Sequence, residues 1–109
     1  MDKTIDEVYA SIGQQIAGAI KDYWSEAWLF VEFFEDAANF KGEYDSDSER
    51  KHYEVPDDVF DDFDVLYEIT TEGGSNRWNR AKFTLYPDGK FNIDFQWDQA
   101  LADEIAANS

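Results

Sequence analysis

The sequence predicts an α+β fold. An N-terminal amphipathic helix packs on an antiparallel sheet of about four to five strands, with a middle helix and a short C-terminal helix. Three patterns support this: apolar residues at helical spacing near the N-terminus, an alternating aromatic run over 24–36, and a hairpin over 81–97. A chain of 109 residues is long enough for one core and too short for two, so we expect a single domain over residues 1–109.

The first helix is expected over residues 4–23. Thr4 and Glu7 have the spacing of a capping box, in which each side chain satisfies a backbone N–H at the start of a helix. Apolar residues follow at helical spacing, which predicts one buried stripe. They are Ile5, Val8, Tyr9, Ile12, Ile16, Ala19 and Ile20.

Residues 24–36 change to a period of two, which predicts a strand. Aromatic rings occupy both of its faces, so we expect it to be central or to lie beneath a helix on each side. One face carries Leu29, Val31 and Phe33, and the other carries Trp28, Phe30 and Phe34.

Two shorter strands are expected over 40–44 and 52–55, with residues 45–51 as a solvated polar loop between them. Pro56 then suits the first turn of a helix, and Asp57 and Asp58 complement its dipole. The buried stripe of this middle helix is expected to be Val59, Phe60, Phe63, Leu66, Tyr67 and Thr70.

The hairpin is the sharpest pattern. Pro87, Asp88 and Gly89 have the chemistry of a tight turn, and a three-residue loop places Tyr86 opposite Lys90. That register puts six apolar residues on one face and two polar pairs on the other. The apolar face is Ala81, Phe83, Leu85, Phe91, Ile93 and Phe95, and the polar pairs are Lys82–Asp94 and Thr84–Asn92.

Residues 98–107 form a short, acidic, Ala-rich segment. It predicts a C-terminal helix that docks through Leu101 and Ile105 or frays. No internal repeat or linker interrupts the chain.

The charge balance restricts the partners. Nine Lys and Arg stand against 25 Asp and Glu, for a formal net charge of −16. Such a chain repels nucleic acid and anionic membranes, and it attracts a basic protein. There is no Cys and no apolar signal segment, so we expect a cytoplasmic protein without disulfides.

Catalytic and metal-binding patterns are weak, which predicts no enzyme, no catalytic residues, no metal site and no cofactor. His52 is the only histidine, and no serine has a visible base beside it. Residues 45–49 space carboxylates like the start of a calcium loop. Arg50 then stands where such a loop needs Gly, and Pro56 where it needs Glu.

Acidic residues are densest between residues 43 and 64, and their number exceeds what solubility requires. We therefore expect a partner-binding surface there, with two tryptophans as aromatic anchors unless a helix covers them. Its carboxylates would be Glu43, Asp45, Asp47, Glu49, Asp57, Asp58, Asp61, Asp62 and Asp64, and its anchors Trp28 and Trp78.

The hairpin also carries a family resemblance. Phe83-Thr84-Leu85, followed by Asp88-Gly89-Lys90-Phe91-Asn92-Ile93-Asp94-Phe95, resembles the most recognisable segment of the YezG-like immunity proteins. The amphipathic first helix, the aromatic strand and Trp78 just before the hairpin fit the same layout. The resemblance implies a small acidic antitoxin, encoded beside a polymorphic toxin of the kind used in contact-dependent inhibition, many of which are secreted nucleases.

The leading hypothesis is therefore an immunity protein, monomeric when alone, that forms a 1:1 heterodimer with a cognate basic toxin, a nuclease, and blocks its substrate cleft. The alternative is an acidic nucleic-acid mimic that inhibits a DNA-binding protein, which requires regularly spaced carboxylates. A third hypothesis is an enzyme with a carboxylate-held metal, which a metal-dependent thermal shift would support.

Overall fold

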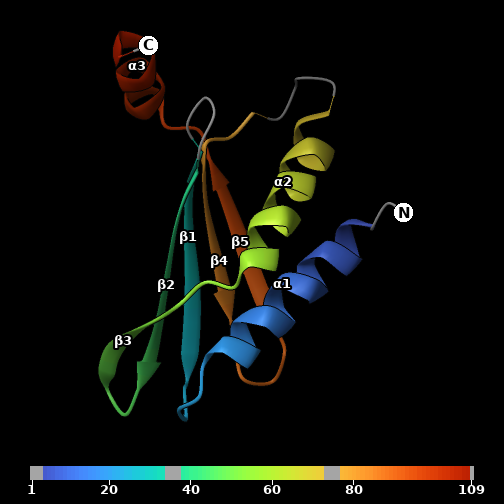
Figure 1. Cartoon of the computed structure of the whole chain (residues 1–109), viewed down its shortest axis with the longest axis vertical. Helices are drawn as coiled ribbons and strands as arrows, with labels where there is room; N and C mark the ends of the chain where they lie inside the picture. The colour runs from blue at the N-terminus through green and yellow to red at the C-terminus, as the bar shows by residue number, and fades with distance from the viewer. Residues whose placement is uncertain (1–3, 34–37, 73–76, 109) are drawn as a thin grey trace.

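The protein has the predicted α+β architecture, shown in Figure 1 by a computed structural model that describes residues 4–33, 38–72 and 77–108. Five strands form one antiparallel sheet in the order β3-β2-β1-β4-β5. Helices α1 and α2 lie side by side on one face of this sheet, and α3 lies at the end of the molecule near the C-terminus (Figure 1). No described helix covers the opposite face, which we call the open face of the sheet.

Helix α1 spans Ile5–Ala19 and begins as predicted. Glu7 N donates to Thr4 Oγ1 at 3.2 Å, and Thr4 N donates back to the Glu7 side chain, so the capping box is complete. The helix ends before the predicted Tyr23 because Ile20 adopts extended backbone, with φ −93° and ψ 119°.

Strand β1, Glu26–Phe33, is central, as its pattern indicated. Leu29 and Val31 face the helices, whereas Trp28 and Phe30 lie on the open face, so helices cover one side only. Phe34, which was expected beside Trp28 and Phe30, lies outside the described residues.

The prediction of a polar loop over residues 45–51 is wrong, because these residues form a hairpin. Strand β2 spans Ala38–Ser46 and β3 spans Glu49–Tyr53, so only Asp47 and Ser48 connect them. Both have positive φ, 49° and 67°, which gives the turn a twist that matches its strands. Cross-strand ion pairs support this charged hairpin, although its side chains have little strand propensity.

Helix α2 spans Asp57–Thr71 and begins directly after Pro56, the residue predicted to stand in its first turn. Val59, Phe63 and Leu66 are fully buried, as expected. Phe60 and Tyr67 are not, because each retains 37% of its surface in contact with solvent at the flank of the helix.

The β4–β5 hairpin, Arg80–Leu85 and Phe91–Gln96, has the predicted register throughout. Tyr86 N donates to Lys90 O at 2.9 Å, and Gly89 closes the turn with φ 90°, a conformation that other residues adopt at a cost. Helix α3, Gln99–Asn108, docks through Leu101, which is 6% exposed; the Ile105 side chain lies outside the described part.

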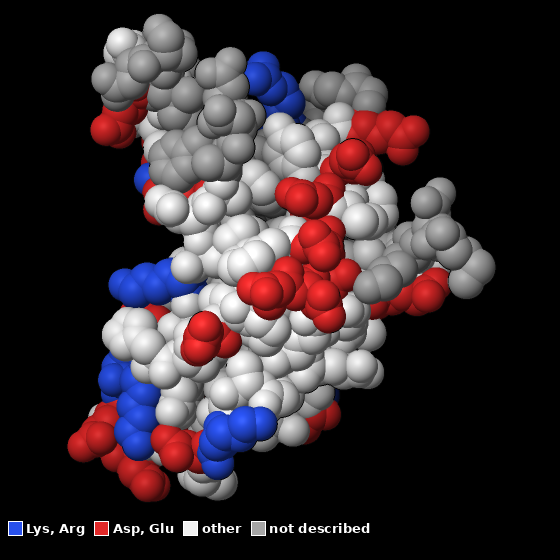
Figure 2. All heavy atoms as spheres, in the orientation of Figure 1, with Lys and Arg blue, Asp and Glu red and all other residues white. Residues whose placement is uncertain are grey.

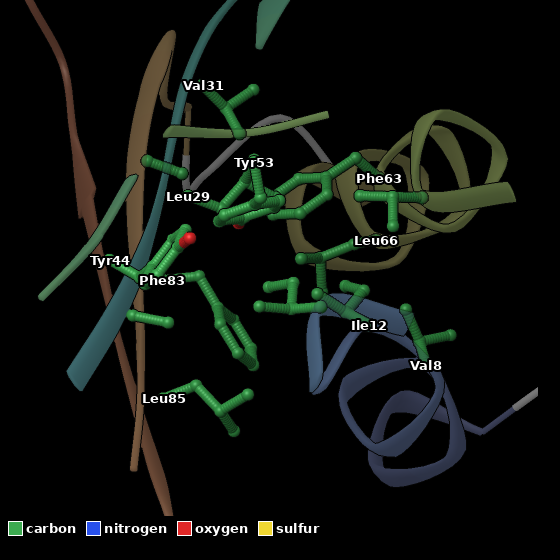
Figure 3. Close-up of a cluster of buried hydrophobic side chains, with 14 of the residues drawn as sticks. Val8, Ile12, Leu29, Val31, Tyr44, Tyr53, Phe63, Leu66, Phe83 and Leu85 are labelled. Atoms are coloured by element: carbon green, nitrogen blue, oxygen red, sulfur yellow. The ribbon is translucent and has the colours of Figure 1, made fainter. Parts of the chain in front are cut away.

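The core lies between the two helices and the sheet. Ile12 of α1 and Phe63 and Leu66 of α2 point toward the strands, where Phe83 is fully buried (Figure 3). Val8 of α1 belongs to the same buried cluster. Burial of such side chains contributes roughly 1.5–3 kcal/mol each.

Tyr53 closes the core at the edge of the sheet. Its ring lies over Gly42, where an added Cβ would come within 2.5 Å of the ring, and its hydroxyl donates to the Trp28 carbonyl at 2.9 Å.

Candidate functional site

The predicted acidic set falls on separate surfaces. Four of its members, Asp57, Asp58, Asp61 and Asp64, lie on the solvent side of α2, where the red atoms of Figure 2 form a band along the helix. Carboxylates at positions i, i+4, i+7 and i+11 share one face of a helix, and this spacing joins Asp57, Asp61, Asp64 and Glu68. All four are exposed, as is Asp58 beside them.

None of these five carboxylates has a Lys or Arg within 4.0 Å among the described residues. Like charges at these helical spacings repel one another, so the arrangement costs α2 some stability. A cationic partner would relieve this repulsion, so the surface is electrostatically suited to bind one.

Two half-exposed rings lie among these charges. The Phe60 ring packs against Phe40 with centroids 4.7 Å apart, and the Tyr67 ring packs against Phe33 and Trp78 at 5.0 and 5.2 Å. Each ring is therefore supported from below and partly open to solvent. We name the exposed carboxylates and these two rings the α2 ridge: Asp57, Asp58, Phe60, Asp61, Asp64, Tyr67 and Glu68.

Asp62 does not belong to this surface. It is 3% exposed, and its Oδ2 accepts hydrogen bonds from Ser11 Oγ at 2.6 Å and Gln15 Nε2 at 2.9 Å. Since it faces α1, it joins the two helices, and the prediction of Asp62 as a partner contact is corrected.

Glu43 and Asp45 lie on the open face of the sheet, where cations already hold them. Glu43 pairs with Lys41 at 3.3 Å and with Arg50 at 3.2 Å, and Asp45 accepts from Arg50 Nε. His52 Nε2 lies 3.3 Å from Glu43. Burial alone would raise the pKa of Glu43, but the hydrogen bonds and charges of Lys41 and Arg50 hold it below its usual range.

Trp28 is not an exposed anchor. It is 8% exposed because the Arg50 guanidinium stacks over its ring, 4.1 Å from the centroid, which is a cation–π contact. Asp47 and Glu49 are exposed, but they lie at the β2–β3 turn and not on α2.

Trp78 was expected to be an aromatic anchor unless a helix covers it, and the structure places it under α2. It is 3% exposed, and its Nε1 donates to Thr70 Oγ1 at 2.8 Å. It precedes β4 on the helix side, where the rings of Tyr67 and Phe95 surround it.

The prediction omitted Glu68 and assigned Phe60 and Tyr67 to the core. The i, i+4, i+7, i+11 spacing from Asp57 would have found Glu68, whereas the half-exposure of the two rings depends on how α2 sits on the sheet.

No group of three His, Asp or Glu in the described part of the chain could hold a metal ion. None of the described helices is long and apolar enough to cross a membrane.

Comparison with known proteins places the chain in a family. A family model described as "Immunity protein YezG-like" matches residues 5–108. "Immunity protein YezG" of Bacillus spizizenii is 24% identical over 116 residues, which covers 91% of this chain and 72% of that protein. The Bacillus subtilis (strain 168) protein of the same name is 23% identical, over 93% of this chain and 78% of its own length. This chain belongs to the YezG-like family of immunity proteins.

Proposed function

We propose that the protein neutralises a cognate toxin, a basic nuclease, by covering its cationic substrate cleft with the α2 ridge in a 1:1 complex. The observation that carries this proposal is the row of exposed carboxylates on α2 without ion pairs among the described residues, beside two supported aromatic rings. A nuclease needs cationic side chains to hold phosphates, and an acidic ridge is complementary to them.

The two kinds of side chain have different tasks. Carboxylates at the rim of an interface speed encounter and set orientation, whereas desolvated aromatic rings at its centre slow dissociation. The carboxylates of the β2–β3 hairpin contribute less in this account, because Arg50 and Lys41 already neutralise Glu43 and Asp45.

The direct test is the salt dependence of complex formation with the C-terminal domain of the toxin encoded beside this gene. The Debye length falls from about 10 Å at 0.1 M salt to about 3 Å at 1 M. We expect the association rate constant to fall at least about tenfold over that range, since steering raises it by one or more orders of magnitude. Nuclease assays with and without the protein then show whether binding blocks the reaction.

An association rate constant that stays the same across this salt range would refute electrostatic steering. Strong inhibition of unrelated DNA-binding proteins, with no preference for the neighbouring toxin, would instead favour the nucleic-acid mimic.

A further inference from the structure

A groove lies between α1 and the turn of the β4–β5 hairpin, away from the α2 ridge. It has a volume of about 300 Å³, at the lower end of the range of ligand pockets, so it fits one side chain. Leu85 of β4 lines it, where Gly13 of α1 approaches closely: a Cβ on Gly13 would lie 3.4 Å from Leu85 Cδ1. Four aromatic rings line the groove: Tyr9, Trp24, Tyr86 and Phe91.

The rings are held in place by the fold. Phe91 stacks on buried Phe83 with centroids 5.3 Å apart and an interplanar angle of 7°, and Tyr9 packs against Phe91 at 5.3 Å. Phe91 and Tyr86 still expose 42% and 39% of their surfaces. Such a pre-formed aromatic lining is suited to an apolar stem or a cation over a ring face.

The charges around the groove favour a cation as its occupant. No residue that lines the groove is itself charged, but two carboxylates lie beside its tyrosines. Burial and the charge of the nearby Glu26 raise the pKa of the Tyr86 hydroxyl, and burial and the charge of Asp6 raise the pKa of the Tyr9 hydroxyl. The nearby cations have other contacts, since Lys21 Nζ donates to Gly18 O at 2.8 Å and Lys90 Nζ lies 3.9 Å from Asp88.

We propose that this groove binds an arginine side chain of the protein partner, with the guanidinium stacked on the aromatic rings and the methylene stem against α1. Arginine combines an apolar stem with a planar, weakly hydrated cation that stacks on rings. The chain already forms this contact internally, where Arg50 lies over Trp28 and Arg77 lies over Trp97. The proposal deepens the proposed function and rests on it only for the identity of the partner.

The first test needs no toxin. N-acetylarginine amide is titrated into the full chain while the ring-proton NMR signals of Tyr9, Tyr86 and Phe91 are followed. The neutral N-acetylcitrulline amide, of nearly the same shape, and N-acetylnorleucine amide are titrated as comparisons. We expect saturable shifts at these rings with the arginine compound, and binding of the citrulline compound about threefold weaker or more.

A matched pair of variants locates the binding. Ala17 lines the groove and is exposed, so Ala17→Phe fills the groove, whereas Ala100→Phe places the same ring on exposed α3. We expect the ring shifts to disappear in Ala17→Phe and to remain in Ala100→Phe. Equal binding of the arginine and citrulline compounds, or tighter binding of the norleucine compound, would overturn the proposal in favour of an apolar anchor.

Toxin binding by the same variants separates this proposal from the proposed function. A tenfold or larger loss of toxin affinity in Ala17→Phe alone would support the groove as part of the interface. Unchanged toxin affinity in Ala17→Phe would refute the groove as a toxin contact and leave the α2 ridge untouched.

Discussion

Asp61 and Asp62 are neighbours in sequence with opposite environments. Asp61 is exposed on the α2 ridge, whereas buried Asp62 accepts hydrogen bonds from Ser11 and Gln15. We expect Asp62→Ala to lower the free energy of unfolding by about 2–4 kcal/mol, because it removes the buried charged acceptor of two hydrogen bonds from α1. Asp61→Ala should change it by no more than about 0.5 kcal/mol. Urea denaturation measures both.

The two substitutions should have the opposite ranking in toxin binding, where Asp61→Ala has the larger effect. Asp61→Ala is expected to slow association, whereas Asp62→Ala should leave the association rate constant of the folded fraction unchanged. Equal stabilities of the two variants would contradict the assignment of Asp62 to the contact between α1 and α2.

Gly42 is required by close packing. A Cβ there would come within 2.5 Å of the Tyr53 ring, so Gly42→Ala should destabilise the protein by about 1–3 kcal/mol. Gly18 is the matched control, since a Cβ there meets nothing within 4 Å. Gly18→Ala should stabilise α1 by up to about 1 kcal/mol, because alanine has the higher helix propensity. Thermal unfolding would contradict this account if both variants shifted the melting temperature in the same direction.

Tyr53 links stability to alkaline pH. Burial raises its pKa well above the ordinary value of 10.0. Between pH 10 and its raised pKa, Tyr53 keeps its proton in the folded state and loses it in the unfolded state. Its contribution to the free energy of unfolding is therefore complete below pH 10 and is lost as the pH rises toward the raised pKa. The free energy of unfolding should therefore fall by up to about 1.4 kcal/mol per pH unit from this residue.

The variant Tyr53→Phe tests this dependence. It should cost about 1 kcal/mol at pH 7, because it removes the hydrogen bond to the Trp28 carbonyl. It should also flatten the decline in stability above pH 10 in urea titrations. A decline as steep as that of the unmodified protein would show that other groups cause it.

At the scale of the element, the proposed complex assigns different effects to the two kinds of side chain on α2: its rings would slow dissociation, and its carboxylates would speed association. Tyr67→Ala should raise the toxin dissociation rate constant about tenfold, the effect of losing an interface anchor. Tyr23→Ala is the control, because Tyr23 is 77% exposed and lies outside the α2 ridge. Surface plasmon resonance measures both. Similar dissociation rates for the two variants would remove Tyr67 from the interface.

Elements with strong local signals could be predicted from the sequence. The Pro87-Asp88-Gly89 turn fixed the register of β4 and β5, and the spacing of Thr4 and Glu7 fixed the start of α1. The β2–β3 hairpin was missed because its stability comes from Arg50 pairing with Glu43 and Asp45 across the strands, which local propensity does not reveal.

The candidate site was harder to predict, because solvent exposure is a property of packing. An alternating pattern places Trp28 on the face opposite the helices, but it does not show that Arg50 covers the ring. Helical periodicity places Asp61 and Asp62 100° apart on a wheel and does not tell which one meets α1. Which carboxylates of α2 are exposed therefore emerged only from the arrangement of α2 on α1 and the sheet.

At the scale of the whole molecule, charge is distributed unevenly. Lys41, Arg50, Arg80 and Lys82 lie on the open face of the sheet, where the first three pair with neighbouring carboxylates. The exposed carboxylates of the α2 ridge have no such pairs among the described residues. The helical side of the sheet therefore carries a row of carboxylates without ion pairs among the described residues, and in the proposed complex this row would orient a cationic partner.

The most direct measurement compares two triple variants in their rates of association with the toxin at low salt. Asp57→Asn/Asp61→Asn/Asp64→Asn neutralises the α2 ridge, and Glu7→Gln/Asp94→Asn/Asp103→Asn removes the same charge elsewhere while Gln at position 7 preserves the capping box. We expect the association rate constant to be at least about tenfold lower for the first variant and to change less than about threefold for the second. Equal losses in both variants would show that net charge alone explains the binding and that the α2 ridge has no special part in it.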